Sequence, residues 1–169
     1  MFMVGYYSTV RIGSMPSRIE ALIPTPPPER IDALQNLILR IVDCLDADEE
    51  CDALIAEADT LAGSQGYDSV TFSNLYSWTS ERDFAVLAAM GPPPGIPDLT
   101  VQEVAECIGV IEAADEPRSS FCLGILERTF PNVPICDMIY WPKAAASSDD
   151  LAAEIVRLAK EPLPTLPAP

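Results

Sequence analysis

The chain has 169 residues, of which 49% are hydrophobic, so it can form a buried core and is not a wholly disordered protein. It carries 26 acidic and 10 basic residues, for a formal net charge of −16. That charge disfavours nucleic acid and anionic membranes as partners and favours a basic protein, although a gain in solubility explains it equally well.

The sequence contains no histidine, which removes the usual general base and the commonest metal ligand. Its five cysteines include no CxxC pair: Cys44, Cys51, Cys107, Cys122 and Cys136. We interpret them as free thiols in a reducing cytosol rather than as disulfides or metal ligands. The apolar runs are too short to span a bilayer, and residues 1–13 do not resemble a signal peptide. We therefore predict a cytoplasmic protein without a metal, a cofactor or a membrane contact.

Residues 1–28 are predicted to be an extended or partly ordered N-terminal extension, because β-type residues precede a proline-rich stretch. A first helical unit is predicted over residues 29–91. Apolar residues at helical spacing indicate a long helix from Glu29, with Pro28 in its first turn, and a second helix from about residue 48 to residue 62. An aromatic connector over residues 70–78 shows no clear periodicity.

Residues 92–97 are rich in proline and glycine and are predicted to form a semi-rigid linker. A second helical unit is predicted over residues 98–162, followed by a proline-rich tail over residues 163–169. Three candidate capping boxes mark helix starts in the two units: Ser80 with Asp83, Thr100 with Glu103, and Ser147 with Asp150.

Both predicted units have the same order of elements: a long helix, a second helix, an aromatic connector and a final helix. We interpret this order as a tandem duplication within an all-α protein, although any small helical bundle can give such an alternation by chance. Acidic corners occupy equivalent places at Asp46-Ala47-Asp48 and Ala113-Ala114-Asp115.

No catalytic constellation can be assembled from these residues, so we predict that the chain is not an enzyme. Paired acids such as Asp149 and Asp150 fall where helix N-termini are expected, and acids there stabilise the helix dipole. Negative charge is densest after the first long helix, where either a solvated face or a patch for a basic partner would explain it. The members of this possible acidic patch are Asp46, Asp48, Glu49, Glu50 and Asp52.

A run of two adjacent aromatic residues, Tyr140 and Trp141, follows Asp137 and ends at Pro142. Residues from about 100 to 162 resemble the colicin- and pyocin-type DNase immunity proteins, whose short third helix reads Asp-Leu-Ile-Tyr-Tyr-Pro where this chain has Asp-Met-Ile-Tyr-Trp-Pro. The corner at Ala113-Ala114-Asp115 is similar to the family's Asn-Ala-Asp corner, and residues 154–160 are similar to its last helix.

The resemblance implies a four-helix unit that binds and neutralises a basic toxin, with a nuclease as the implied class. It carries the anchor roles to Asp137, Tyr140 and Trp141. Side chains of the second helix set the choice of partner in that family, and the candidates here are Glu116, Ser119, Ser120 and Glu127. This chain departs from the pattern in three ways: Trp141 replaces the second tyrosine, the preceding loop is longer, and the second helix is less acidic.

The rival interpretation is a helical scaffold or adaptor that binds a basic protein, in which the Tyr-Trp run closes the core of its unit. The first unit offers only residues 74–78, with Tyr76 and Trp78, and would be a degenerate copy. Exposed Tyr140 and Trp141 with buried Tyr76 and Trp78 would favour binding, and burial of all four would indicate a core role. The sequence sets neither the partner nor the oligomeric state.

Overall fold

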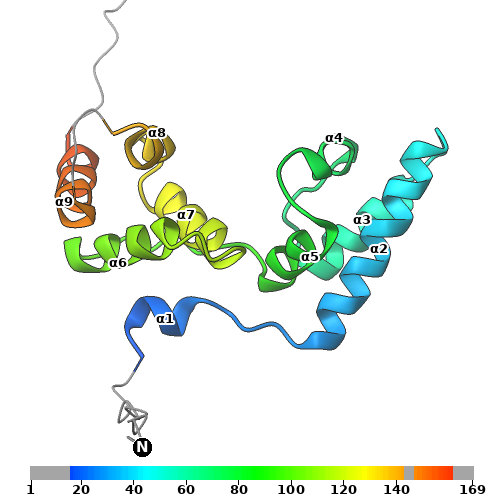
Figure 1. Cartoon of the computed structure of the whole chain (residues 1–169), viewed down its shortest axis with the longest axis horizontal. Coiled ribbons are helices and arrows are strands. Elements are labelled where there is room, and N and C mark those ends of the chain that lie inside the picture. Colours follow the sequence, from blue (N-terminus) through cyan, green and yellow to red (C-terminus); the bar gives the residue numbers. More distant parts are fainter. Residues whose placement is uncertain (1–15, 143–146, 162–169) are drawn as a thin grey trace, which may run out of the picture.

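The computed structural model describes residues 16–142 and 147–161, and all regular structure in these ranges is helical (Figure 1). The elements are α1 (Arg18–Leu22), α2 (Pro28–Asp46), α3 (Asp52–Ala62), α4 (Ser69–Ser73), the 3-10 helix η1 (Leu75–Ser77), α5 (Glu81–Met90), α6 (Val101–Glu112), α7 (Arg118–Thr129), α8 (Ile135–Tyr140) and α9 (Ser148–Ala159). The predicted all-α class is confirmed. The aromatic connector of the first unit differs from prediction, because it folds into α4 and η1.

Local sequence signals account for most helix ends. Pro28 occupies the first turn of α2, and Gly63 ends α3 with a φ of 94°, a left-handed conformation that favours glycine. At α6 the capping box is complete: the Glu103 N–H donates to Thr100 Oγ1 at 3.2 Å, and the Thr100 N–H donates to Glu103 Oε2 at 2.8 Å. One predicted start is wrong, since α3 begins at Asp52 rather than near residue 48. The chain first turns through Asp48, whose φ is +57°.

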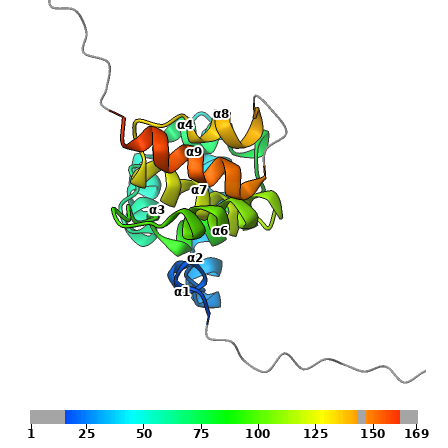
Figure 2. The same cartoon turned by 90° about the vertical axis from the view of Figure 1, so that its left-hand side faces the viewer.

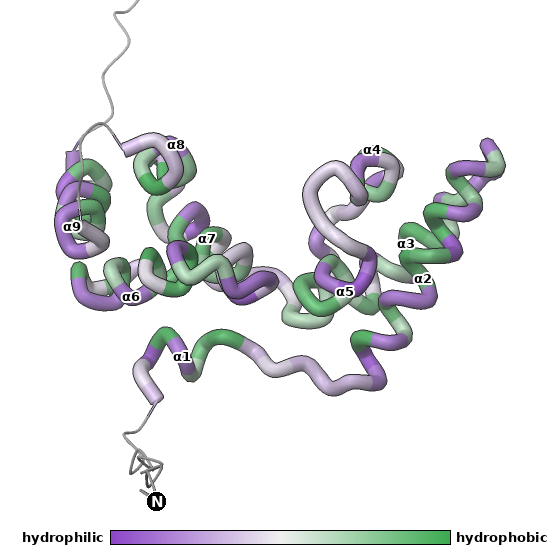
Figure 3. The backbone as a smooth tube through the Cα atoms, in the orientation of Figure 1, coloured by the Kyte–Doolittle hydropathy of each residue, from purple (hydrophilic) through white to green (hydrophobic). Residues whose placement is uncertain are grey.

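Buried side chains form two separate clusters, one in each half of the chain. Members of the first come from α2 to α5 and include Leu34, Ile38, Ile41, Phe72, Leu75 and Phe84. Members of the second come mainly from α6 to α9 and include Val104, Ile108, Phe121, Ile125, Leu126 and Ile155. Figure 3 shows hydrophobic and hydrophilic residues alternating along these helices, as expected for helices that each bury one face.

The two halves space their helices alike. The second long helix of each half begins at Asp52 and at Arg118, and the next element begins at Ser69 and at Ile135, an offset of 66 residues in both cases. The turn after the first long helix passes through a residue with positive φ in each half, Asp48 at 57° and Ala114 at 50°. The halves differ in packing: α4 lies against α2, whereas α8 lies against α7 and α9. Duplication as the origin of this pattern stays a prediction.

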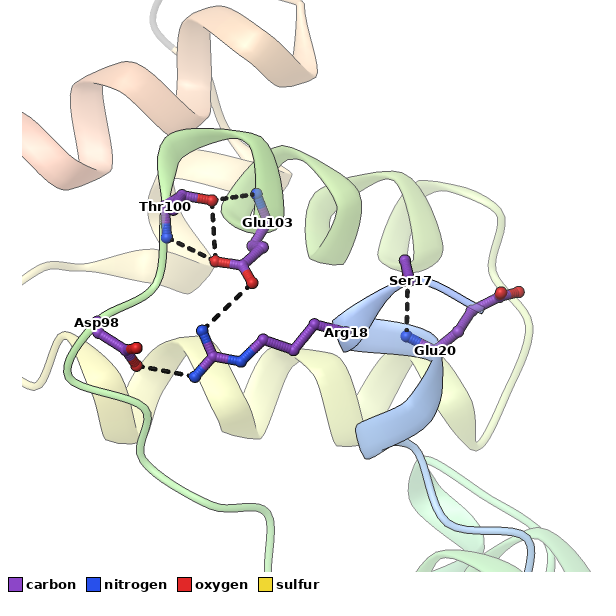
Figure 4. Close-up of polar contacts among 6 residues, drawn as sticks. All are labelled: Ser17, Arg18, Glu20, Asp98, Thr100 and Glu103. Carbon is purple, nitrogen blue, oxygen red and sulfur yellow. Dashed lines mark hydrogen bonds and ion pairs between the residues drawn. The ribbon is translucent and has the colours of Figure 1, made fainter. Parts of the chain in front are cut away.

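The N-terminal extension contributes to the second core, which the sequence did not predict. Within it α1 packs on α6 and buries Ile19 completely. Arg18 pairs with Asp98 at 2.8 Å and with Glu103 at 3.3 Å, so its guanidinium joins α1 to the start of α6 (Figure 4). The predicted β-type stretch, Phe2 to Ile12, lies outside the described residues.

The predicted linker is fixed in place by contacts with α7. The Ile96 N–H donates to Thr129 Oγ1 at 2.9 Å, and the Ile96 side chain is buried. Pro93 lies so close to Gly124 that a Cβ atom at Gly124 would fall 2.5 Å from Pro93 Cγ. The chain therefore passes between the halves as a packed segment, and α5 contacts α7 at the same junction.

The arrangement places α8 and α9 at one end of the long axis and the corner between α2 and α3 at the other (Figure 1). In both perpendicular views α4 and α8 lie on one side of the molecule, and α1 lies on the opposite side (Figures 1 and 2). α8 ends in the aromatic corner of the second half, and η1, which directly follows α4, carries the aromatic corner of the first half.

Candidate protein-binding surface

One face of α8 packs against the core, and the opposite face is exposed to solvent. Pro134 precedes the helix, Ile135 is buried, and Met138 and Ile139 pack against the second core. Asp137 and Tyr140 project to the other side because helical side chains three apart share a face. The helix thus anchors itself through the apolar residues of the motif and leaves the acid and the aromatics available.

The Tyr-Trp pair lies at the surface. Tyr140 is 51% exposed and Trp141 is 72% exposed, and their ring centroids are 6.0 Å apart in an edge-to-face arrangement. The Trp141 N–H donates to the Asp137 carbonyl at 3.0 Å, which closes the last turn of α8. The hypothesis that these two rings close the core of their unit is therefore wrong.

Two carboxylates, those of Glu116 and Glu127, lie near Tyr140. Glu127 and Asp137 line one pocket of about 260 Å³ beside α8, and the Cys136 thiol donates to Glu127 Oε1 at 3.2 Å. Partial burial raises the pKa of Tyr140, and the nearby Cys136, where it is ionised, and the carboxylates of Glu116 and Glu127 raise it further. Glu116 and Glu127 therefore lie in the same region as Tyr140, and Asp137 shares its face of α8, while the part of these residues in binding a partner stays a prediction.

The second-helix candidates have different positions. Glu116 is exposed and accepts hydrogen bonds from the hydroxyls of Ser119 and Ser120, the latter at 2.7 Å. Ser120 is half-buried, and Ser119 is only 2% exposed. Ser119 as a direct contact for a partner is a wrong prediction, because helical periodicity turns it toward the core. Its hydroxyl instead orients Glu116.

The first half also exposes its aromatic corner, with Tyr76 60% and Trp78 54% exposed. Neither expected pattern is therefore observed, since all four rings are accessible. Trp78 packs edge-to-face on Phe84 with centroids 5.7 Å apart, which connects it to the first core. A narrow cleft of about 100 Å³ lies at the junction of the halves, lined by Trp78, Thr79, Asp83, Leu87, Glu116, Pro117 and Ser120. No sequence motif groups Trp78 and Asp83 with Glu116, so only the fold reveals this cleft.

The possible acidic patch is a separate feature. Asp46, Asp48, Glu49, Glu50 and Asp52 are all exposed. They lie at the corner between α2 and α3, which is at the far end of the long axis from α8 (Figure 1) and is hydrophilic in Figure 3. This patch and the aromatic anchors are therefore not parts of one contact surface.

Other chemistry is sparse in the part of the chain that the structure describes. All five cysteines are free thiols. Among residues 16–142 and 147–161, no three Cys, Asp or Glu side chains are grouped so that they could hold a metal ion. Within the same ranges no helix combines the length and the apolar character needed to cross a membrane.

Comparisons with known proteins identify no relative. No family model, no curated protein and no solved structure matches the chain. The function is therefore inferred from the residues of the surface and from the motif at Asp137 to Pro142.

Proposed function

We propose that this protein is a cytoplasmic immunity protein that binds and neutralises a basic bacterial toxin, with a nuclease as the class that the motif implies. The observation that carries the proposal is the exposed Tyr140–Trp141 pair beside the exposed carboxylates of Asp137, Glu127 and Glu116. Tyrosine and tryptophan supply a large share of binding energy in protein interfaces, and complementary charges add specificity and a faster association.

The proposed division of labour follows from charge and burial. A net charge of −16 accelerates the approach of a basic toxin and gives a salt-dependent association rate. Once the complex forms, burial of the two exposed rings slows its dissociation. Because Ile135 is buried in the second core, α8 presents the rings from a fixed support and little entropy is lost on binding.

Neutralisation would follow from where a nuclease carries its positive charge. Nucleases bind the phosphate backbone through lysine and arginine side chains. An acidic protein that occupies this basic surface competes with DNA by charge and by bulk. The mechanism requires no catalytic group on the immunity protein, in agreement with the prediction that the chain is not an enzyme.

The direct test is co-expression followed by a binding titration. The probes are DNase domains of the colicin and pyocin type and the product of any adjacent reading frame that encodes a basic C-terminal domain. We expect the chain to protect cells from one of these toxins, and Tyr140→Ala to weaken binding by at least about 2 kcal/mol. Tyr140→Ala and Trp141→Ala complexes as tight as wild type would refute the anchor assignment.

Tyr76→Ala is the matched control, since Tyr76 is as exposed as Tyr140 but lies on η1 in the other half. We expect Tyr76→Ala to bind like wild type. A chain that protects against none of these toxins, yet captures a different basic protein through Tyr140, would be an adaptor rather than an immunity protein.

A further inference from the structure

The cleft between the two halves combines an aromatic ring with two carboxylates. Trp78 and Asp83 come from the first half. Glu116, which precedes α7, and Ser120, in the first turn of α7, come from the second half. At about 100 Å³ it is much smaller than the roughly 300–1,000 Å³ typical of pockets for cofactors or drug-sized ligands. A single side chain of a partner protein is the size of ligand that fits.

Both carboxylates are already oriented by hydroxyl groups. Glu116 accepts from Ser119 and from Ser120, and the Ser80 hydroxyl donates to Asp83 Oδ2 at 2.7 Å. Ser80 Oγ in turn accepts from the Asp83 N–H at 3.1 Å, so the residue is held at the first turn of α5. Neither acid takes part in an ion pair among the described residues, in contrast to Asp32, Asp98 and Asp115, which each pair with an arginine.

Trp78 adds an aromatic ring to the two carboxylates, and together these groups can bind a cation. Its ring is more than half exposed while its packing against Phe84 fixes its position. Tryptophan is the aromatic residue that attracts cations most strongly, and a guanidinium can stack on a ring while donating hydrogen bonds to carboxylates. The net charge of the whole chain is negative, so its long-range field attracts an incoming cation.

The cleft is also close to the anchors on α8. Glu116 lines the cleft, and its negative charge is one of those that raise the pKa of Tyr140. In Figures 1 and 2, α4 and α8 lie on the same side of the molecule, and α5 contacts α7 between them. One partner that covers Tyr140 and Trp141 can therefore also reach the cleft.

We propose that the cleft formed by Trp78, Asp83 and Glu116 binds one arginine side chain of the basic partner, so that the first half takes part in recognition. The site rests on the proposed function in that the arginine belongs to the same partner. It selects a planar cation: the guanidinium stacks on Trp78 and donates to the carboxylates of Asp83 and Glu116. This assigns to the first half a role beyond that of a degenerate copy.

The test uses the full-length protein and a small probe. The probe is the capped tripeptide acetyl-glycyl-arginyl-glycine amide, and its neutral isostere with citrulline in place of arginine is the control. The chain has two tryptophans, so the two indole N–H signals in a nitrogen-15 correlation spectrum are assigned with Trp78→Phe and Trp141→Phe. The Trp141 signal is an internal reference for weak, nonspecific contact.

We expect the arginine peptide to shift the Trp78 indole signal saturably, with little change at Trp141, and the citrulline peptide to leave both signals in place. Glu116→Gln and Asp83→Asn are each expected to weaken this binding roughly two- to five-fold, as loss of one exposed ion pair does. Glu57→Gln removes one exposed charge on α3, away from the cleft, and is expected to keep the wild-type affinity.

Several results would overturn the proposal: no saturable shift at Trp78, equal shifts at both tryptophans, an equal response to citrulline, or the same weakening in Glu57→Gln as in the cleft variants. Because the titration contains no toxin, its outcome is separate from that of the toxin experiment. In the toxin experiment, loss of protection removes the immunity function, and a Tyr140→Ala complex as tight as wild type removes the anchor assignment. Failure of the peptide titration removes only the arginine site.

Discussion

Trp78 in the first half and Trp141 in the second are both exposed, but they rest on different supports. Trp78 packs against Phe84 of the first core and forms one wall of the cleft at the junction. Trp141 contacts the ring of Tyr140 and is the more exposed of the two. The two halves therefore share a helix order and differ in how each one offers an aromatic surface.

Under the proposed function, this difference lets the two halves contact the partner in different ways. A ring fixed against the core, beside oriented carboxylates, suits a single charged side chain. A ring pair at the end of a short helix suits burial against a broad apolar area of a partner. The predictions below test how independent the halves are and whether the two rings differ as described.

The largest loss of unfolding free energy is expected when a large buried side chain is removed from either core. Phe72 and Phe121 are almost completely buried in the first and second cluster, and substitution of either by alanine should cost about 3–5 kcal/mol of unfolding free energy. Because the linker and the contact between α5 and α7 join the halves, we expect one urea transition that both variants lower. Two separate transitions, each sensitive to only one variant, would show that the halves fold independently.

The next largest loss of unfolding free energy is expected at α1, which packs against the second core. Ile19→Ala should destabilise the protein by roughly 2–5 kcal/mol, because Ile19 is fully buried against α6. Thermal unfolding followed by circular dichroism measures the loss. Arg18→Ala is the comparison, since its ion pairs are exposed and should contribute less than about 1 kcal/mol. Equal losses from the two variants would contradict the packing role of α1.

A smaller effect is expected from the helix caps, with one cap tested in each half. Thr100→Ala and Ser80→Ala should each cost about 1 kcal/mol, because each hydroxyl accepts from a backbone N–H in the first turn of a helix. Urea denaturation at neutral pH measures both. An unchanged midpoint in either variant would contradict the cap at that position.

The Thr100 cap also has a pH signature. Hydrogen bonds from the Thr100 backbone and hydroxyl lower the pKa of Glu103, and the Arg18 charge lowers it further. This carboxylate therefore stabilises the fold above its unfolded pKa, and the contribution is lost as the pH falls through its folded value. Carbon-13 NMR titration of Glu103 should show a higher pKa in Thr100→Ala than in wild type.

The smallest effect concerns the two tryptophans themselves. Trp78→Ala should destabilise the protein by about 1 kcal/mol, because it loses the edge-to-face contact with Phe84. Trp141→Ala should change the unfolding free energy by less than about 0.5 kcal/mol, as surface substitutions do. Chemical denaturation measures the unfolding free energy of each variant. A larger loss in Trp141→Ala than in Trp78→Ala would contradict the view that only Trp78 is supported by a core.

The helices themselves could be predicted from local signals. The capping box at Thr100, the first-turn proline at Pro28 and the glycine stop at Gly63 are found as predicted, since each depends on backbone chemistry within a few residues. The local rules failed at α4, where Ser69 to Ser73 forms a single helical turn. Asp68 caps this turn by accepting from the Thr71 N–H, but so short a helix also needs the burial of Phe72 in the first core, which a local pattern does not show.

The candidate site was predictable in part for the same reason. The motif around Asp137, Tyr140 and Trp141 is contiguous, so the sequence alone identified it, whereas the packing of Ile135, Met138 and Ile139 beneath it came from the structure. By contrast, the cleft joins Trp78 and Asp83 to Glu116, more than thirty residues away along the chain. The burial of Ser119 and the insertion of Ile19 into the second core likewise depend on which helix faces meet.

Sequence by itself determined the helical class, the caps and the aromatic motif, because these arise from neighbours in the chain. Only the tertiary structure decided which aromatics and carboxylates share a surface, because packing of distant helices sets those distances.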